Sequence, residues 1–239
     1  MTSNYMTFGE AFRVYPVRGY HGMFHLLHDV AKKEAILIDT GMFGEMPRLG
    51  ALLRDIGLDW PDIKAILLTH GHLDHTGNLA QIKELTKAPI LAHSLEQPHI
   101  DGVYPYRGPS RVCGALESIG RGLFRYRPVA IDQPLVPETE LPCWGGLRVI
   151  HLPGHTVGHC GFFSERHNLL FSGDLFADYW FSTHLPPPFL NSCPQHFEAS
   201  LRKVKQLSPR FIIPNHYDRF DGEWHRRKFD QLAGPRAAI

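Results

Sequence analysis

The spacing of apolar residues along the first half of the chain predicts strands followed by helices. Residues 11–18 and 22–30 partly alternate apolar and polar side chains, as half-buried strands do. Residues 34–39 form a short apolar run that leads into Thr40 and Gly41, which is typical of a buried strand stopping at a turn. Residues 45–56 carry apolar side chains at helical spacing, which predicts a helix that stops at Gly57. The same half also predicts a buried strand over 63–69, a helix over 78–86 and a strand over 89–92.

The second half repeats this order of strands and then helices. Its predicted elements are strands over 147–152, 160–164 and 168–172, a proline-rich and aromatic loop over 176–194, a helix over 195–207, a strand over 211–214 and a last helix over 222–232. We therefore expect two similar halves packed sheet to sheet. Residues 94–144 fit neither pattern, and a segment too long for a plain connection usually forms a functional lid or contains helices of its own.

Composition limits the classes of protein that this chain can belong to. A length of 239 residues with 43% hydrophobic residues predicts a single domain over residues 1–239 with a sizeable core. The formal net charge of +1 argues against a nucleic-acid partner, since such proteins usually carry a strong basic excess. No run approaches the roughly 18 apolar residues of a membrane span, and the N-terminus shows no signal-peptide pattern. We expect a cytoplasmic protein that acts on a small molecule rather than on a membrane.

Histidine is the residue that stands out, because the chain has 16 and several follow predicted strands. The run T-H-G-H-L-D-H spans residues 69–75, directly after the strand predicted from residue 63 onward. His155, Asp174 and His216 are placed in the same way, and Asp39 closes the apolar run at 34–39. Strand ends are rigid and open to solvent on one side, so they are good places for ligand side chains.

The spacing of these residues predicts two neighbouring metal sites. His70 and His72, one residue apart in a tight turn, can both face one metal ion, and His155 would complete a site of three histidines with an open position, as in catalytic zinc centres. Asp74, His75 and His216 would form the second site. Asp174 can bridge the two, because a carboxylate has two oxygens. Two metal ions roughly 3.5–4 Å apart are a common hydrolytic arrangement. Zinc is our first expectation, although these ligands also suit iron and manganese.

The order and context of these motifs resemble the metallo-β-lactamase superfamily. The motifs that carry the resemblance are L-I-D-T-G, L-L-T-H-G-H-L-D-H-T-G-N, H-L-P-G-H-T-V-G-H and L-L-F-S-G-D, which look like the glyoxalase-II-type branch. The resemblance implies an α/β fold, a four-layer αββα sandwich with the metals at one edge between the sheets. It implies that Asp39 orients a ligand rather than touching a metal. It also implies that Asp74 and Asp174 take part in catalysis by a dinuclear-metal-bound hydroxide.

Several reactions are compatible with that resemblance. The leading expectation is a metal-dependent hydrolase that cleaves an ester, thioester, lactone or amide. A glyoxalase-II activity is disfavoured because the chain continues only briefly after His216. An acyl-homoserine-lactone lactonase is disfavoured because Ala177 occupies the place of that branch's tyrosine, although Tyr179 can substitute. A β-lactamase would be exported, and no export signal is seen. The alternative outside hydrolysis is a persulfide dioxygenase with one iron held by His70, His155 and Asp174.

Three further residues are candidates for contact with substrate. His184 and Tyr179 belong to the aromatic segment that follows Asp174, and Tyr217 follows His216 directly. The alternative for each is ordinary packing within a long loop. A homodimer is the oligomeric state that we expect by analogy with enzymes of this kind.

Overall fold

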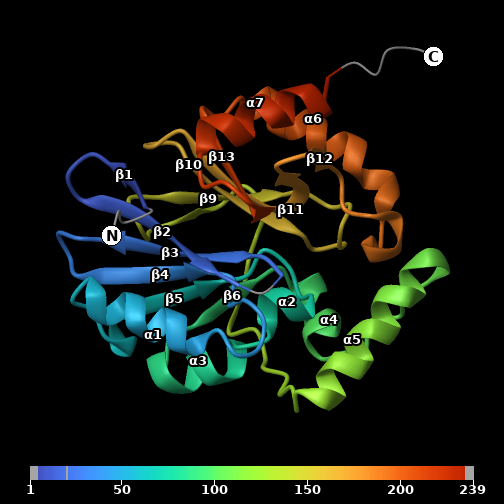
Figure 1. The fold of residues 1–239 in the computed structure, drawn as a ribbon, viewed down its shortest axis with the longest axis horizontal. Coiled ribbons are helices and arrows are strands. Elements are labelled where there is room, and N and C mark those ends of the chain that lie inside the picture. The colour runs from blue at the N-terminus through green and yellow to red at the C-terminus, as the bar shows by residue number, and fades with distance from the viewer. Residues whose placement is uncertain (1–4, 20, 235–239) are drawn as a thin grey trace.

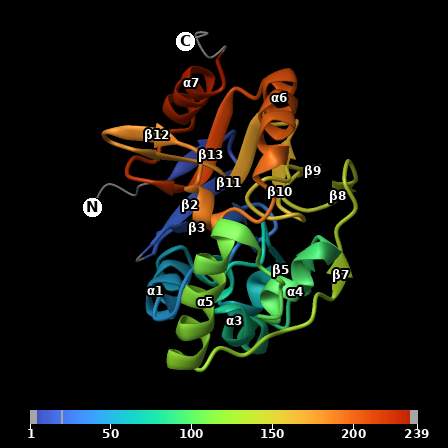
Figure 2. The same ribbon diagram turned by 90° about the vertical axis from the view of Figure 1, so that its right-hand side faces the viewer.

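The computed structural model describes residues 5–19 and 21–234 and consists of four layers (Figure 1). Two β-sheets pack face to face, and helices cover the outer face of each sheet. Figure 2 looks onto one edge of this arrangement, with α6 and α7 on the side of one sheet and α1 and α3 on the side of the other. This is the αββα sandwich expected from the sequence.

The first sheet is built by the first half of the chain in sequence order, from β1 to β7. The pairs from β1 to β4 are antiparallel, whereas β4, β5, β6 and β7 run parallel. Its strands are β1 (Met6–Phe8), β2 (Phe12–Arg18), β3 (Met23–Asp29), β4 (Glu34–Ile38), β5 (Ile63–Leu67), β6 (Ile90–Ala92) and β7 (Gln133–Pro134).

The second sheet has the order β12-β11-β10-β9-β8, and β13 pairs in parallel with β11. Its strands are β8 (Glu140–Leu141), β9 (Leu147–His151), β10 (Cys160–Ser164), β11 (Leu169–Tyr179), β12 (Ser182–His184) and β13 (Phe211–Tyr217). Gly161 shows why these strands can lie so close, since a Cβ on it would approach the Phe171 carbonyl oxygen to 2.8 Å.

The helices cover the two outer faces and one edge. On the outer faces lie α1 (Met46–Asp55), α3 (Leu79–Thr86), α6 (Phe197–Leu207) and α7 (Gly222–Leu232). At the edge lie α2 (Leu73–Thr76), α4 (Gln97–Ile100) and α5 (Arg111–Leu123). The segment over residues 94–144 therefore contains helices of its own, as its length predicted. None of the helices in the described ranges has the length and apolar character needed to cross a membrane.

Three apolar clusters hold the layers together. The cluster between the sheets includes Val14, Leu27 and Phe162, all with no exposed surface. A second cluster packs the first sheet against α1 and α3, and a third packs the second sheet against α6 and α7. Burial of this apolar surface is the main force that aligns the two sheets. It fixes the edge at which the histidine motifs meet.

The prediction that residues 176–194 form a loop was wrong at its start. β11 continues through Tyr179, turns and pairs with β12, and Ala177 is also in register with His216 of β13. Asp174 therefore lies within a strand rather than at its end, whereas His216 is the penultimate residue of β13. The register between β11 and β13 shifts on both sides of Gly173, so Asp174 sits in a β-bulge. Such irregularities re-aim side chains, which explains how a residue within a strand reaches the metal ligands.

Candidate metal centre

The loop between β5 and α2 brings four of the predicted ligands to the edge between the sheets. His70 and His72 lie in this loop, and Asp74 and His75 lie in α2. The rings of His70, His72 and His75 are buried, whereas about a third of the Asp74 side chain (30%) is exposed. The loop approaches its neighbours closely at Gly71, where a Cβ would come within 2.7 Å of the His99 side chain. Glycine is therefore required between the two histidines.

The second sheet contributes the remaining three ligands, and all seven predicted residues come together. His70, His72 and His155 form one group, Asp74, His75 and His216 a second, and Asp174 forms a third with His70 and His75. The ligand atoms within each group lie within 4.8 Å of one another. Asp174 connects the groups, since Oδ2 lies 3.4 Å from His155 Nε2 and 3.2 Å from His216 Nε2.

The donor atoms at this edge fit divalent metal ions. His70 Nε2, His75 Nε2 and Asp174 Oδ1 are buried, yet none of them makes a hydrogen bond within the described part of the chain. His72 Nδ1 and His155 Nε2 face each other at 2.8 Å. Buried polar atoms are normally paired, so a cluster of nitrogens and carboxylate oxygens without hydrogen-bond partners has the chemistry of a site for a divalent cation. Imidazole and carboxylate together suit zinc, iron and manganese.

Asp39 makes four hydrogen bonds, three to the segment that carries the ligands, including one to the predicted ligand His75, and one to Asn215 of β13. Its Oδ1 accepts from the Thr69 backbone N–H at 2.8 Å, and its Oδ2 accepts from the Thr69 hydroxyl at 2.8 Å and from Asn215 Nδ2 at 2.7 Å. The same oxygen lies 3.0 Å from His75 Nδ1, which leaves Nε2 free to face the metal. The backbone at Asp39 has a φ of 62°, an uncommon value for a residue other than glycine. Its place is that of an orienting residue, as the resemblance implied.

The other ring nitrogens are fixed by partners that the sequence did not reveal. Asn191 Oδ1 lies 2.9 Å from His155 Nδ1, and the Asn191 amide also donates to the Pro186 carbonyl. The Thr69 hydroxyl lies 3.0 Å from His70 Nδ1. These contacts orient the rings so that the opposite nitrogens face the centre. Asn191 carries no sequence signal, because it is one polar residue within a proline-rich segment far from the histidine motifs.

Two buried carboxylates from the segment over residues 94–144 hold the backbone of the ligand loop. Glu96 accepts from the N–H groups of Gly71 and Gly158, both at 2.7 Å. Glu117 accepts from the N–H of Leu73 and from the hydroxyl of Tyr106, also both at 2.7 Å. Each glutamate is thus bonded through both oxygens. Both position the backbone of the loop, and Glu117 also lines the cavity beside it.

Burial and charge divide the histidines into two classes. Burial lowers the pKa of His72 and of His155 to about 4 and also lowers the pKa of His70. These rings are neutral near pH 7, the form in which imidazole binds metal. Burial alone would lower the pKa of His75 and His216, but Asp174 and Asp74 raise the pKa of both well above the ordinary value. These two rings are therefore protonated in the metal-free protein.

This difference predicts that metal binding releases protons at neutral pH. Filling the group of Asp74, His75 and His216 requires two imidazoles with raised pKa to lose a proton, so we expect release of about two protons per chain. Because protonated rings compete with the metal, affinity for this group should fall as the pH falls below these raised pKa values. Calorimetric titration of zinc in buffers of different ionisation enthalpy measures the release. Replacing His216 with alanine should lower it by about one proton, and equal heats in all buffers would contradict the prediction.

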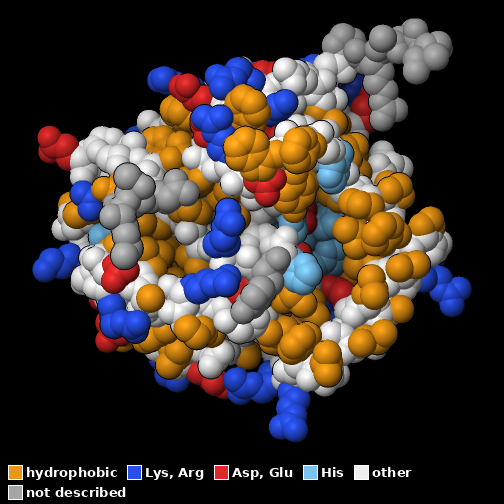
Figure 3. All heavy atoms as spheres, viewed as in Figure 1, with side chains coloured by type: hydrophobic (Ala, Val, Ile, Leu, Met, Phe, Trp, Pro, Cys, Tyr) orange, Lys and Arg blue, Asp and Glu red, His pale blue; other side chains and the backbone are white. Residues whose placement is uncertain are grey.

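A cavity of about 350 Å³ opens over the ligands. In Figure 3 histidine side chains lie in a hollow, with hydrophobic side chains beside them on the side where Figure 1 shows α5. Tyr179 lies near this site, since its hydroxyl is 3.3 Å from His216 Nδ1, and the ring of His184 lies 6.3 Å from that of Tyr179. Neither residue lines the cavity itself. The cavity is lined by His21, Met42, His72, Leu73, Asp74, Cys113, Leu116, Glu117, Gly120, His155, Asp174, Leu190 and His216.

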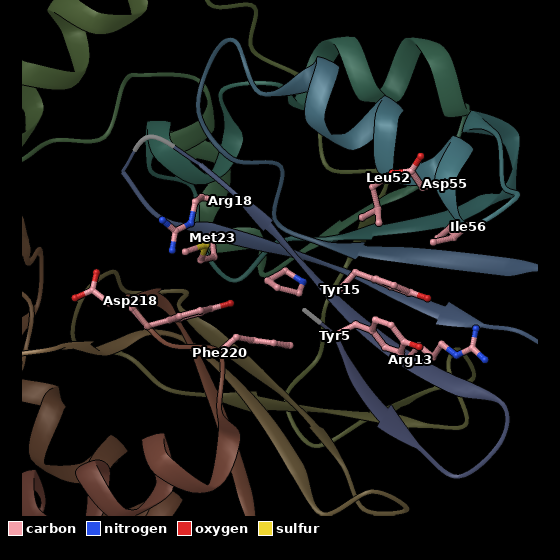
Figure 4. Close-up of a pocket in the computed structure, with 12 residues that line it drawn as sticks. Tyr5, Arg13, Tyr15, Arg18, Met23, Leu52, Asp55, Ile56, Asp218 and Phe220 are labelled. Atoms are coloured by element: carbon pink, nitrogen blue, oxygen red, sulfur yellow. The ribbon is translucent and has the colours of Figure 1, made fainter. Parts of the chain in front are cut away.

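Tyr217, the third predicted substrate contact, points elsewhere. It is buried, and its hydroxyl lies 3.0 Å from His25 Nε2. Adjacent residues on a strand face opposite sides of the sheet, so Tyr217 turns away from the centre that His216 joins. It lines a second, larger cavity of about 730 Å³, whose walls include Arg18 and Met23 at one end and Tyr5 and Tyr15 at the other (Figure 4). None of the seven predicted ligands lines this second cavity.

Comparison with known proteins places the chain in a family of metal-dependent enzymes. The family model described as the metallo-beta-lactamase superfamily matches residues 26–216, which include every predicted ligand. The chain is 28% identical to the probable metallo-hydrolase YflN of Bacillus subtilis, over 85% of this chain and 83% of that protein. It is 29% identical to a hydroxyacylglutathione hydrolase of Bdellovibrio bacteriovorus, over 79% of this chain and 60% of that protein. The chain thus spans less than two thirds of the second relative's length.

Solved structures share the architecture. A metallo-beta-lactamase family protein from Thermus thermophilus superposes with a TM-score of 0.73 at 23% identity, over 93% of this chain and 78% of that one. The metallo-beta-lactamase GOB-18 from Elizabethkingia meningoseptica superposes with a TM-score of 0.67 at 22% identity, over 94% of this chain and 88% of that one. At such identities the likeness concerns the fold. Together with the family match and the cluster of histidines and aspartates, it identifies the chain as a metal-binding hydrolase of the metallo-beta-lactamase superfamily.

Proposed function

We propose that this hydrolase holds two zinc ions and cleaves a small ester, thioester, lactone or amide. The observation that carries the proposal is the position of Asp174. Its two oxygens lie within 3.2–3.4 Å of His75, His155 and His216, which belong to both ligand groups. A carboxylate shared in this way supports a bridged pair of ions better than a single one. His70, His72 and His155 would hold one ion, and Asp74, His75 and His216 the other.

The residues around the ions divide the remaining work. Bound zinc ions would polarise the reacting carbonyl and make water a stronger acid. Asp74 is the ligand whose carboxylate is most exposed to the cavity, at 30%, so it is placed to accept a hydrogen bond from the attacking water and orient it. Burial alone would raise the pKa of Asp74, but His75 and His216 lower it and keep the carboxylate ionised. Leu73, Cys113 and Leu116 give one side of the cavity an apolar lining.

Thioesters are the first substrates to test, because the Bdellovibrio relative is named a hydroxyacylglutathione hydrolase. The chain also resembles a probable metallo-hydrolase without a named substrate, so esters, lactones and β-lactams belong in the same panel. A persulfide dioxygenase with one iron on His70, His155 and Asp174 remains the alternative chemistry. The structure offers that reaction no specific support, because Asp74, His75 and His216 are gathered as well.

Elemental analysis combined with an oxygen-free assay tests the proposal. We expect about two zinc ions per chain and turnover of at least one member of the panel without oxygen. Dialysis against a chelator should abolish turnover, and added zinc should restore it. A single iron per chain, no hydrolysis and oxygen uptake with a persulfide substrate would replace the proposal with the dioxygenase.

A further inference from the structure

Helix α5 presents an apolar stripe to the outside of the molecule. Val112, Leu116, Ile119 and Leu123 recur at helical spacing and are 52%, 58%, 67% and 72% exposed. The buried residues of the same helix are Cys113 and Glu117. A surface helix ordinarily turns such a stripe toward the core, and exposed leucines grouped on one face mark a binding surface more often than scattered ones do.

The stripe is continuous with the cavity over the metal ligands. Leu116 belongs to both, since it lines the cavity and lies at the centre of the stripe. Gly120 brings the helix close to the ligand loop, because a Cβ there would lie 2.8 Å from Leu73 Cδ2. From Leu116 to Leu123 the stripe extends about 10 Å along the helix axis, since each residue advances about 1.5 Å. A group attached to a carbonyl at the centre can therefore reach the stripe without leaving the protein surface.

The 3₁₀ turn Pro188–Leu190 contributes a second apolar wall to the cavity beside Leu116. It packs against α5 and against the 3₁₀ turn that precedes α5. Leu190 lines the cavity, and Phe189 is 39% exposed beside it. The two sides of the cavity mouth, formed by α5 and by this turn, thus carry aliphatic or aromatic side chains.

The part of the cavity wall that the structure describes lacks a long basic side chain that could hold a carboxylate away from the centre. No lysine or arginine is among the described residues that line it. The acidic side chains of the wall are Asp74, Asp174 and Glu117, and both oxygens of Glu117 already accept hydrogen bonds, from Leu73 and Tyr106. A carboxylate remote from the reacting carbonyl, as in a glutathione thioester, would therefore find no arginine or lysine partner on this part of the wall.

We infer that the substrate carries an uncharged, extended aliphatic group, which lies along the groove between the α5 stripe and the turn Pro188–Leu190. The inference rests on the proposed function, because it places the reacting carbonyl over the metal ligands. The aliphatic group can be the acyl chain or the alkyl part of the leaving group, and both present the same surface to the groove. Leu116 is then the residue that determines specificity, since it lies where the cavity meets the stripe.

Two series of thioesters test this inference. One series varies the acyl chain from two to ten carbons on a constant uncharged thiol, and the other varies the thiol's alkyl chain on a constant acetyl group. We expect kcat/KM to rise about two- to threefold per methylene in one of them, because each methylene leaves water for a groove that buries part of it. The series that rises identifies the aliphatic part. Flat profiles in both, or faster cleavage of the glutathione thioester than of its uncharged counterpart, would overturn the inference.

A binding measurement separates this inference from the proposed hydrolysis. Methyl ketones of the same chain lengths have no leaving group, so their affinity for the zinc-loaded protein reports the groove alone. If no thioester is cleaved while ketone affinity rises with chain length, the proposed thioester hydrolysis is wrong and the inferred aliphatic ligand is supported. If ketone affinity is independent of length, the ligand class is wrong whatever the enzyme cleaves.

Variants locate the effect on α5. Leu116→Glu should reduce the ratio of kcat/KM between the eight-carbon and two-carbon substrates by about tenfold or more. Leu85→Glu is the matched control, because Leu85 is a 43% exposed leucine on α3 and lines no part of the cavity. It should keep the wild-type ratio. A second copy of the chain could instead cover the stripe. If Ile119→Glu converts a dimer to a monomer in sedimentation and leaves the ratio unchanged, the stripe is a subunit interface and the inference fails.

Discussion

Replacing Asp174 with alanine is expected to lower kcat/KM by about a thousandfold or more and to leave the fold in place. The variant removes the carboxylate that lies between the two ligand groups, so two bound ions would lose the ligand that they share. Asp174 lies in the bulge of β11, and its backbone N–H donates to His159 Nε2 at 3.0 Å. That bond does not involve the side chain and holds the strand in the variant. Steady-state kinetics and metal content, measured on the same preparation, check the prediction.

The control for this experiment is the same substitution at an aspartate outside the centre. Asp230 is exposed on α7 and pairs with Arg226 across one helical turn, at 2.9 Å. Surface pairs of this kind contribute little, so Asp230→Ala should keep wild-type kinetics and metal content. If Asp174→Ala remained fully active with two ions bound, the bridging role would be wrong.

Replacing Asp39 with alanine is expected to weaken metal binding by about 10- to 100-fold without removing a ligand. Three donors would lose their acceptor, namely the Thr69 backbone, the Thr69 hydroxyl and the Asn215 amide. His75 would lose the partner that fixes its ring. Because each buried group left without a partner costs roughly 1–3 kcal/mol, the free energy of unfolding should fall by about 3 kcal/mol or more.

Metal titration and urea denaturation of Asp39→Ala and Asp39→Asn separate the effect of the lost hydrogen bonds from that of backbone strain. Asp39→Asn tolerates the φ of 62° as well as aspartate does, and it keeps one acceptor oxygen while losing the charge. It should fall between the wild type and Asp39→Ala in both measurements. Unchanged affinity and stability in Asp39→Ala would show that the ligand loop is held by packing alone.

The residues that could be predicted from the sequence are those whose chemistry is concentrated in short motifs. His70, His72, Asp74 and His75 fall within six positions after an apolar run, and few functions other than metal binding use such a cluster. The strands near them were predictable because alternation and apolar runs reflect burial in a sheet directly. This local information identified four of the seven ligands, and the resemblance to a known family implied that the others meet them at one edge.

The contacts that hold those ligands could not be predicted, because they depend on how distant segments pack. Asn191, Glu96 and Glu117 are single polar residues that become partners of the ligand loop only in the folded chain. The length of β11 was underestimated because glycine and aspartate interrupt its apolar pattern at the bulge. The stripe on α5 would have been assigned to the core by periodicity alone, and only its exposure shows that it faces outward.

The predicted metal ligands come from both sheets, so bound ions would oppose local opening of the sandwich. His70, His72, Asp74 and His75 follow strand β5 of the first sheet, whereas His155, Asp174 and His216 belong to or follow strands of the second. Bound ions would therefore add a tie between two halves of the sandwich, which hydrogen bonds such as that from Asn215 to Asp39 also join at this edge. Local opening of either half requires release of the ions, so their binding energy adds to the cost of opening both. Metal supply would thus contribute to the lifetime of the folded chain as well as to its activity.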